Sequence, residues 1–257
     1  MLLAIDIGNS NVVIGCLNDR LETIEEFRMV SDLKKTVHEY TAQMKTILDY
    51  NNIDCSGFEG AIICSVVPPL TDVFRSAVEK ICGHKPLIVG TGIKTGLNIM
   101  IENPSSLGSD LVADSVAAMA DYPLPVIVFD MGTATTITVV DKKGNYIGGA
   151  IVPGVGISVN ALSNGTSLLQ RVPLEAPKKV INTMTIESMQ SGAIYGAAAM
   201  MDGMVDRFEE ELGEHCSLVA TGGIAGIIVP HCRHDIVYDR NLLLRGLGII
   251  YRKNKRK

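Results

Sequence analysis

The sequence lacks any uninterrupted apolar run as long as the roughly 18 residues that a membrane-spanning helix needs. It also lacks an excess of positive charge, since its formal net charge is −5 at pH 7. A chain of this charge is not expected to take nucleic acid or an anionic membrane as its main partner. Basic residues gather only at positions 252–257, which we interpret as a solvated chain end. We therefore expect no nucleic-acid partner and no membrane partner.

Tryptophan is absent, and the six cysteines form no Cys-x-x-Cys pair. In a chain of 257 residues this spacing indicates reduced, mostly buried thiols, which are typical of cytoplasmic proteins. No cationic leader precedes Asp6, so no signal peptide is expected. The hydrophobic content of 47% supports a sizeable core, and the length suits one large domain or two modest ones.

Two short stretches of the chain resemble each other and lie almost half the sequence apart. Each runs an apolar strand into Asp-x-Gly, continues with small polar residues and returns to apolar strand. The first stretch contains Asp6 and Gly8, and the second contains Asp130 and Gly132. One such hairpin would be an ordinary β-turn, but two at corresponding places indicate an internal duplication. The glycine lets backbone approach a ligand and donate to phosphate, while the carboxylate can hold a cation.

The rest of the chain alternates strand and helix patterns. Apolar, β-branched runs predict strands, and apolar residues at helical spacing predict helices. The predicted strands are 2–7, 11–17, 22–30, 61–67, 86–89, 126–129, 136–141, 146–151 and one from 218, and the predicted helices include 37–48, 108–120 and 188–212. Residues 91–107 are predicted to be irregular. This order indicates an α/β fold of mixed sheets covered by helices. We divide it into domains at 1–116 and 117–257, near the helix-breaking Pro123 and Pro125.

The helix expected at 108–120 carries two acidic residues near its start. Ser109 is predicted as its N-cap, and Asp110 lies in its first turn, where a carboxylate interacts favourably with the helix dipole. Asp114 follows one turn later on the same helical face. We hypothesise that this like charge helps to raise the pKa of Asp110. The alternative is an Asp114 that faces solvent or caps a neighbour.

Three glycine turns, at Gly8, at Gly132 and at Gly222-Gly223, suggest a site for ATP. The first two would face the phosphates, and the third would approach the adenosine. No Gly-Lys-Ser/Thr follows a strand, so the pattern differs from a P-loop. Phosphate charge must then be met by amides, hydroxyls and a metal such as Mg²⁺. Asp6 and Asp130 are the candidate cation ligands, and we expect them to converge on one triphosphate.

Several motifs together resemble those of type III pantothenate kinases. They are Asp-Ile-Gly-Asn-Ser-Asn at 6–11, Ser-Val-Val-Pro-Pro at 65–69, Glu-Asn-Pro at 102–104, Gly-Ser-Asp at 108–110, Asp-Met-Gly-Thr-Ala-Thr-Thr at 130–136, Pro-Gly-Val-Gly-Ile-Ser at 153–158, Ser-Met-Gln-Ser-Gly at 188–192 and Ala-Thr-Gly-Gly at 220–223. The match covers nearly the whole chain in order. The resemblance implies a duplicated actin/hexokinase-like (RNase H-like) fold with mixed five-stranded sheets. It also implies a cytoplasmic homodimer that phosphorylates pantothenate from ATP, as the first step toward coenzyme A.

The resemblance also implies a role for individual residues. The general base would be Asp110, and the ligand of a monovalent cation, K⁺ or NH₄⁺, would be Asp130. The implied ATP contacts are Asp6, Gly8, Asn9, Ser10, Asn11, Val13, Thr133, Gly222 and Gly223. The implied pantothenate contacts are Ile101, Gly108, Ser109, Asp110, Leu111, Arg171 and Thr185.

At two positions of the implied pantothenate pocket the chain differs from the family pattern. Leu111 stands where the family usually has Arg, and Ile101 stands where it usually has Tyr. Both replacements remove a polar group, and the lost Arg would have offered pantothenate a charge-assisted hydrogen bond. Arg171 matches a family Arg and is retained. These differences leave two alternatives open: a nucleotide-binding regulatory homologue, or a kinase of another small hydroxy acid.

Overall fold

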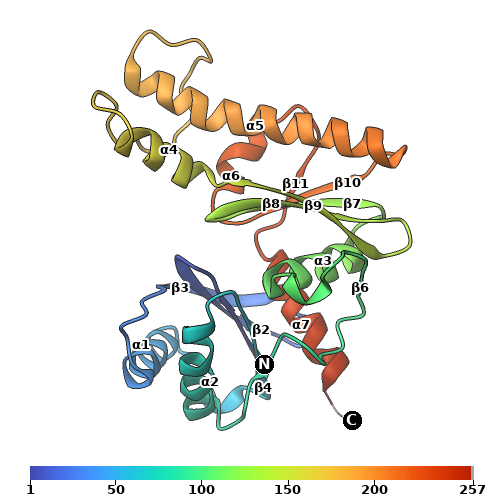
Figure 1. The fold of residues 1–257 in the computed structure, drawn as a ribbon. Coiled ribbons are helices and arrows are strands. Elements are labelled where there is room, and N and C mark those ends of the chain that lie inside the picture. The colour runs from blue at the N-terminus through green and yellow to red at the C-terminus, as the bar shows by residue number, and fades with distance from the viewer. Residues whose placement is uncertain (256–257) are drawn as a thin grey trace. The chain divides into compact units, whose positions relative to one another are not determined.

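The computed structural model describes residues 1–255, and the chain forms two compact units. The first unit comprises residues 1–97, residues 102–120 and the segment that begins at Asn241; the second comprises residues 98–101 and 121–240. Each unit has its own sheet and its own helices (Figure 1). Within residues 1–255, no helix is both long enough and apolar enough to cross a membrane.

The first unit is built on a five-stranded mixed sheet in the order β3-β2-β1-β4-β5. Its strands are β1 (Leu2–Ile7), β2 (Asn11–Leu17), β3 (Thr23–Val30), β4 (Gly60–Ser65) and β5 (Leu87–Ile88). The first three strands form an antiparallel meander, and β4 runs parallel to β1. The strands predicted at 2–7 and 11–17 are confirmed at those bounds, because their apolar, β-branched residues fill both faces of a central pair.

The helices of the first unit are α1 (Val37–Tyr50), α2 (Pro68–Cys82), α3 (Ser109–Asp121) and α7 (Leu242–Asn254), with short 3₁₀ turns at Cys55–Gly57 and Pro104–Ser106. The predicted start of α1 is confirmed. Thr36 caps the helix, and the Glu39 carboxylate accepts a hydrogen bond from the Thr36 N–H at 2.8 Å, which completes a capping box. Pro68 begins α2, where its missing N–H costs no helical hydrogen bond.

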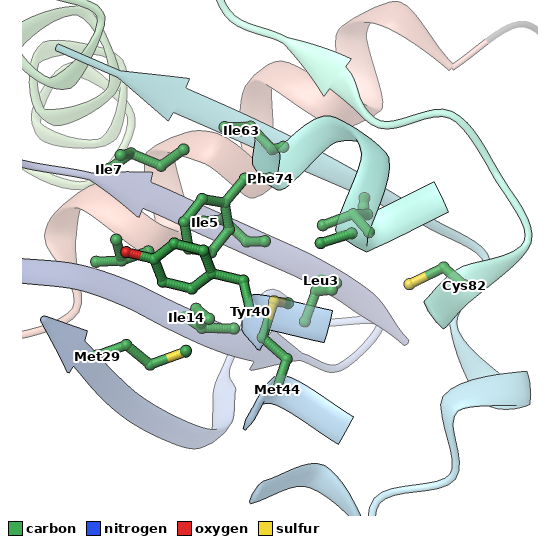
Figure 2. Packing of buried hydrophobic residues seen from close by; sticks show 14 of the residues in the cluster. Leu3, Ile5, Ile7, Ile14, Met29, Tyr40, Met44, Ile63, Phe74 and Cys82 are labelled. Atoms are coloured by element: carbon green, nitrogen blue, oxygen red, sulfur yellow. The ribbon is translucent and has the colours of Figure 1, made fainter. Parts of the chain in front are cut away.

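Helices α1 and α2 cover one face of the first sheet. Figure 2 shows the rings of Tyr40 and Phe74 beside the alternate β1 residues Leu3, Ile5 and Ile7, and the two ring centroids lie 4.5 Å apart. All five side chains are completely buried. Because side chains alternate along a strand, the intervening β1 residues, including Asp6, lie on the opposite face of the sheet.

Helix α7 packs against β1, β2 and β4. Gly246 of α7 also meets α3 closely, since a β-carbon there would overlap the backbone of Ala113. This close approach brings α3, which carries Asp110, into the first unit.

The second unit repeats the topology of the first. Its sheet has the order β11-β10-β7-β8-β9-β6. The strands are β6 (Asn98–Ile99), β7 (Val126–Met131), β8 (Ala134–Val140), β9 (Asn145–Pro153), β10 (Ser217–Thr221) and β11 (Val237–Tyr238). Strands β7, β8 and β9 form the antiparallel meander, and β10 runs parallel to β7, as β4 does to β1. The predicted duplication is therefore visible in the strand order.

The helices of the second unit are α4 (Val155–Asn164), α5 (Thr185–Leu212) and the short α6 (Ala225–Ile228), which is followed by a 3₁₀ turn at Val229–His231. The long helix α5 packs on the sheet through a stripe of buried residues that includes Ile194, Met201 and Val205. The predicted start at residue 188 is one turn late, because α5 already begins at Thr185.

Two features of the fold differ from the sequence-based expectations. The second sheet has six strands rather than five, because β6 pairs with the edge of β9 within the stretch predicted to be irregular. Helix α7 falls within the predicted second domain, 117–257, but it packs against strands of the first unit. That division stays a prediction about domains. The spacing of apolar residues predicts that a helix buries one face, but it does not predict which sheet that face packs against.

Candidate active site

The first Asp-x-Gly turn joins β1 to β2. Asp6 is the last residue but one of β1, and the Gly8 N–H donates to the Asn11 carbonyl at 3.0 Å to close the turn. Ser31 follows β3, and its hydroxyl donates to the Gly8 carbonyl at 2.6 Å, which gives the turn a second hydrogen bond. The expected ATP-binding segment is therefore one hairpin, in which Asn9, Ser10 and Asn11 are exposed and Asp6, Gly8 and Val13 are half-buried.

A buried cysteine lies beside Asp6, and the sequence analysis did not single it out. Cys64 is the register partner of Asp6 across the β1–β4 pair, and its Sγ donates to Asp6 Oδ1 at 3.2 Å. Burial raises the pKa of the Cys64 thiol well above its ordinary value, and the carboxylates of Asp6, Asp110 and Asp114 raise it further. The only signal in the sequence was its place in the strand that ends at Ser-Val-Val-Pro-Pro.

The start of α3 is tied to the end of β4. The Ser109 hydroxyl accepts from the Ser65 N–H at 3.0 Å and donates to the Ser65 carbonyl at 3.1 Å. The prediction of Ser109 as the N-cap was wrong. Ser109 is the first residue of the helix, and its hydroxyl forms hydrogen bonds with the backbone of β4 rather than with its own helix. These contacts hold the first turn of α3 next to the carboxyl end of β4.

Asp110 lies in the first turn of α3, as predicted, and is partly buried. Its Oδ1 accepts from the Leu111 N–H at 2.8 Å. Burial raises the pKa of Asp110 above its ordinary value, and hydrogen bonds from backbone N–H groups oppose that rise. A β-carbon on Gly108 would overlap Asp110 Oδ1, so glycine at 108 leaves room for this carboxylate position.

Asp114 does not face solvent, because only 1% of its surface is exposed. Its carboxylate raises the pKa of the Cys64 thiol, as do the carboxylates of Asp6 and Asp110. The raised pKa of Asp110 has burial as its main cause, and Asp114 is not among its causes. The solvent-facing alternative for Asp114 is therefore wrong, while its influence on Asp110 stays a hypothesis.

The second Asp-x-Gly turn has the same form as the first. Asp130 is the last residue but one of β7, and the Gly132 N–H donates to the Ala134 carbonyl at 3.0 Å. Asp130 and Gly132 are half-buried, and Thr133 is exposed. The backbone before α4 runs close beneath this turn, since a β-carbon on Gly154 would overlap the carbonyl oxygens of Gly132 and Thr133.

The third glycine turn follows β10 and lies beside the second one. Thr221, at the end of β10, is the register partner of Asp130. Gly222 has a φ of +92°, and a β-carbon there would come within 2.7 Å of the Met131 backbone. This position therefore needs glycine both for its backbone conformation and for space. Within the second unit the structure thus brings Asp130, Gly222 and the turn through Thr133 together.

The remaining predicted pantothenate residues of the second unit occupy separate segments. Ile101 is half-buried and lies beside Gly148 of β9: its Cγ2 would be 4.0 Å from a β-carbon placed on that glycine. Arg171 is exposed in the irregular segment between α4 and α5, and Thr185 is the exposed first residue of α5. Leu111 is half-buried next to Asp110 in the first unit.

One cavity of the second unit lies away from these turns. A cavity of about 440 Å³ in the second unit is lined by residues such as Glu209, His215, Leu218 and His234, at the start of β10 rather than at its Gly222 end. None of the predicted site residues lines it.

The donor set of the turns limits what kind of metal could bind. Nowhere in residues 1–255 do three His, Cys, Asp or Glu side chains form a group that could hold a metal ion. A cation at Asp6 or Asp130 would therefore draw most of its ligands from phosphate and water, which is how Mg²⁺ is usually held beside nucleotides. Such a cation fits the sparse carboxylates of these two turns.

Comparisons with known proteins agree with the motifs. The family model "Type III pantothenate kinase" matches residues 2–207. A type III pantothenate kinase of Moorella thermoacetica is 41% identical over 99% of this chain and 100% of its own length. One of Exiguobacterium sp. is 40% identical over the full length of both chains. Among solved structures, a putative 2-dehydro-3-deoxygalactonokinase of Sinorhizobium meliloti covers 100% of this chain and 98% of its own, with a TM-score of 0.61 and 11% identity. The fold is thus the expected actin/hexokinase-like one.

Proposed function

This chain belongs to the type III pantothenate kinase family, and on that premise we propose how its residues carry out the reaction. The chain is a phosphotransferase that acts on an alcohol group and phosphorylates pantothenate from ATP in coenzyme A biosynthesis. The near full-length likeness to curated kinases favours this enzyme over a regulatory homologue or a kinase of another hydroxy acid.

Asp110 carries the proposed mechanism. Its half-buried carboxylate accepts a hydrogen bond from the Leu111 N–H, and burial raises its pKa above the ordinary value. In the reaction the hydroxyl oxygen of pantothenate attacks the γ-phosphorus of ATP, its proton passes to Asp110, and ADP leaves. A base with a raised pKa accepts that proton more readily than an ordinary aspartate does.

The glycine turns are proposed to hold ATP. The amides and hydroxyls of residues 8–11 would bind phosphate oxygens, since Asn9, Ser10 and Asn11 of this turn are exposed. Thr133, which is an exposed residue, would contact ATP, and Gly222 and Gly223 would let backbone approach the adenosine. These assignments rest on the turn geometry of each unit and on the family resemblance.

Asp6 and Asp130 are proposed as cation ligands, for Mg²⁺ and for K⁺ or NH₄⁺ respectively. A bound cation would neutralise charge on the transferring phosphate. Asp130→Asn should then weaken the response of turnover to K⁺ while leaving the fold intact, which thermal unfolding would check. A K⁺ response equal to that of the unchanged protein would remove Asp130 from this role.

Pantothenate is proposed to contact Gly108, Ser109, Leu111, Ile101, Arg171 and Thr185. With Leu111 and Ile101 apolar, Arg171 is the proposed cationic partner of the pantothenate carboxylate. Its guanidinium is exposed and therefore accessible to a ligand. Arg171→Gln should raise the KM for pantothenate more than the KM for ATP.

A homodimer is also proposed, with its surface on α4 and on α5, including the Gly/Ala-rich stretch from Ser188. Apolar side chains of α4 are exposed, namely Ile157 at 47% and Leu162 at 45%. The double change Ile157→Glu and Leu162→Glu should halve the mass measured by light scattering. Tyr50→Glu, at an exposed apolar side chain of the first unit, is the matched control.

A cytoplasmic location is proposed from the family resemblance and from the six cysteines, all of which are free thiols. Cell fractionation with compartment markers tests it directly. Recovery of the protein in a membrane or secreted fraction would contradict it.

The proposed activity is tested by measuring ADP release with a coupled assay, with and without pantothenate and K⁺. Pantothenate-dependent ADP release, with phosphopantothenate identified by mass spectrometry, is the expected result. Nucleotide binding without any such turnover would point to the regulatory alternative. Turnover with a different hydroxy acid alone would point to the other kinase.

A further inference from the structure

Cys64 occupies an unusual position in the first unit. It is the register partner of Asp6 across the parallel β1–β4 pair, so the two side chains project from the same face of the sheet. The neighbouring residues Ile5 and Ile63 project to the other face and join the apolar cluster under α1 and α2. Cys64 therefore does not belong to that cluster, although it is completely buried.

The Cys64 thiol contacts the carboxylate that the proposed function assigns to the cation and the phosphates. Its Sγ donates to Asp6 Oδ1 at 3.2 Å. The negative charges of Asp110 and Asp114, both on α3, also raise the pKa of this thiol. A fully buried neutral donor thus lies among three carboxylates of the first unit.

The chemistry of a thiol suits this place. A lysine or arginine at 64 would bind Asp6 strongly but would also neutralise the charge that a cation needs. A carboxylate at 64 would repel Asp6, and an apolar side chain would leave the Asp6 oxygen without this donor. A thiol is a weak, neutral donor, so it can fix the direction of the carboxylate and leave its negative charge in place.

We propose that Cys64 is a positioning residue of the nucleotide site: its thiol holds one carboxylate oxygen of Asp6, so that Asp6 meets the cation and the phosphates in a single orientation. This inference rests on the proposed role of Asp6 in binding ATP with its metal. Cys64 itself touches neither ATP nor pantothenate in this proposal.

The test compares side chains of similar size that differ in their ability to donate. Cys64→Val removes the donor, and Cys64→Ser keeps one. We expect Cys64→Val to weaken the binding of Mg-ATP by about three- to tenfold, the range for losing one ordinary hydrogen bond, because a thiol is a weak donor. The KM for pantothenate should stay nearly constant, and Cys64→Ser should restore most of the nucleotide affinity.

Cys16→Ala is the matched control, because Cys16 is a buried thiol of the same sheet that lies in the apolar cluster. It should lower stability without a selective loss of Mg-ATP binding. The inference is overturned if Cys64→Val and Cys64→Ser bind Mg-ATP equally well, or if both lose affinity to the same extent. Should Cys64→Val fail to fold, Cys64→Ala and Cys64→Ser carry the same comparison.

Asp6→Asn separates this inference from the proposed function. Weak Mg-ATP binding by Asp6→Asn, combined with unchanged binding by Cys64→Val, would overturn the role of Cys64 alone. Unchanged binding by Asp6→Asn would overturn the proposed role of Asp6, and the positioning role of Cys64 with it.

Discussion

The Ser109 hydroxyl exchanges two hydrogen bonds with the backbone of Ser65, at 3.0 and 3.1 Å. Ser65 is the last residue of β4, and Ser109 is the first residue of α3. The residue after Ser109 is the proposed general base, and the residue before Ser65 contacts Asp6. One pair of serines therefore joins the helix of the proposed base to the strand beside the proposed nucleotide carboxylate.

Removing the Ser109 hydroxyl should lower the stability of the folded protein. In Ser109→Ala the backbone groups of Ser65 lose their partner, which should lower the free energy of unfolding by about 1–3 kcal/mol. Urea unfolding measures this change. Thr46→Ala is the control, because the Thr46 hydroxyl donates only to the exposed turn of its own helix. Equal losses in the two variants would contradict a special role for the Ser65–Ser109 contact.

Replacing the proposed base should affect chemistry rather than nucleotide binding. Asp110→Asn cannot accept the proton of the attacking hydroxyl, so kcat should fall by about 10²–10⁴-fold. ADP release gives kcat, and calorimetric titration gives the affinity for ATP, which should stay close to that of the unchanged protein. Turnover that persists at the original rate would remove Asp110 from the mechanism.

The pH dependence of turnover should follow the raised pKa of Asp110. The base works only when deprotonated, so kcat/KM should fall as the pH drops through that pKa, above the ordinary value of 3.8. The residual activity of Asp110→Asn should lack this acid limb. If kcat/KM instead fell only at the ordinary pKa of an aspartate, the proposed rise of the Asp110 pKa through burial would be contradicted.

The same shift has an opposite consequence for stability. The folded protein keeps the proton of Asp110 to a higher pH than the unfolded chain, so this residue costs stability as the pH rises through that window. Asp110→Asn should therefore have the higher Tm at neutral pH, and its advantage should shrink as the pH falls through the raised pKa. Thermal unfolding at several pH values measures the difference.

The position of the Asp110 carboxylate should depend on the glycine before it. A β-carbon in Gly108→Ala would overlap Asp110 Oδ1 and displace the carboxylate, so kcat should fall by about tenfold or more. Gly90→Ala is the control, since a β-carbon at Gly90 meets nothing within 4 Å. Equal kcat values for the two variants would show that Asp110 needs no such space.

The glycine turn after β10 should tolerate no side chain. Gly222 and Gly213 both have positive φ, at +92° and +72°, so alanine is strained at either position. Only at 222 would the β-carbon also meet backbone, that of Met131 at 2.7 Å. Gly222→Ala should therefore unfold at lower urea concentration than Gly213→Ala and bind ATP more weakly. The reverse order of stability would contradict the close packing of this turn.

Local patterns in the sequence predicted the parts of the structure that depend on neighbours along the chain. The bounds of β1 and β2, the cap at Thr36 and the two Asp-x-Gly turns follow from alternation, hydrogen-bonding side chains and glycine, all of which act within a few residues. The duplication could be inferred for the same reason, because each half repeats the local pattern.

The sequence by itself determined the α/β class, the repeated turns and the residue types of the site. Tertiary structure alone decided that Ser109 bonds Ser65, that Cys64 contacts Asp6 and that α7 packs on the first sheet. Each of these contacts joins residues more than 40 positions apart, and their register is set by strand pairing and helix packing. A buried polar group finds its partner only when distant segments are packed together, so no local pattern could predict these pairs.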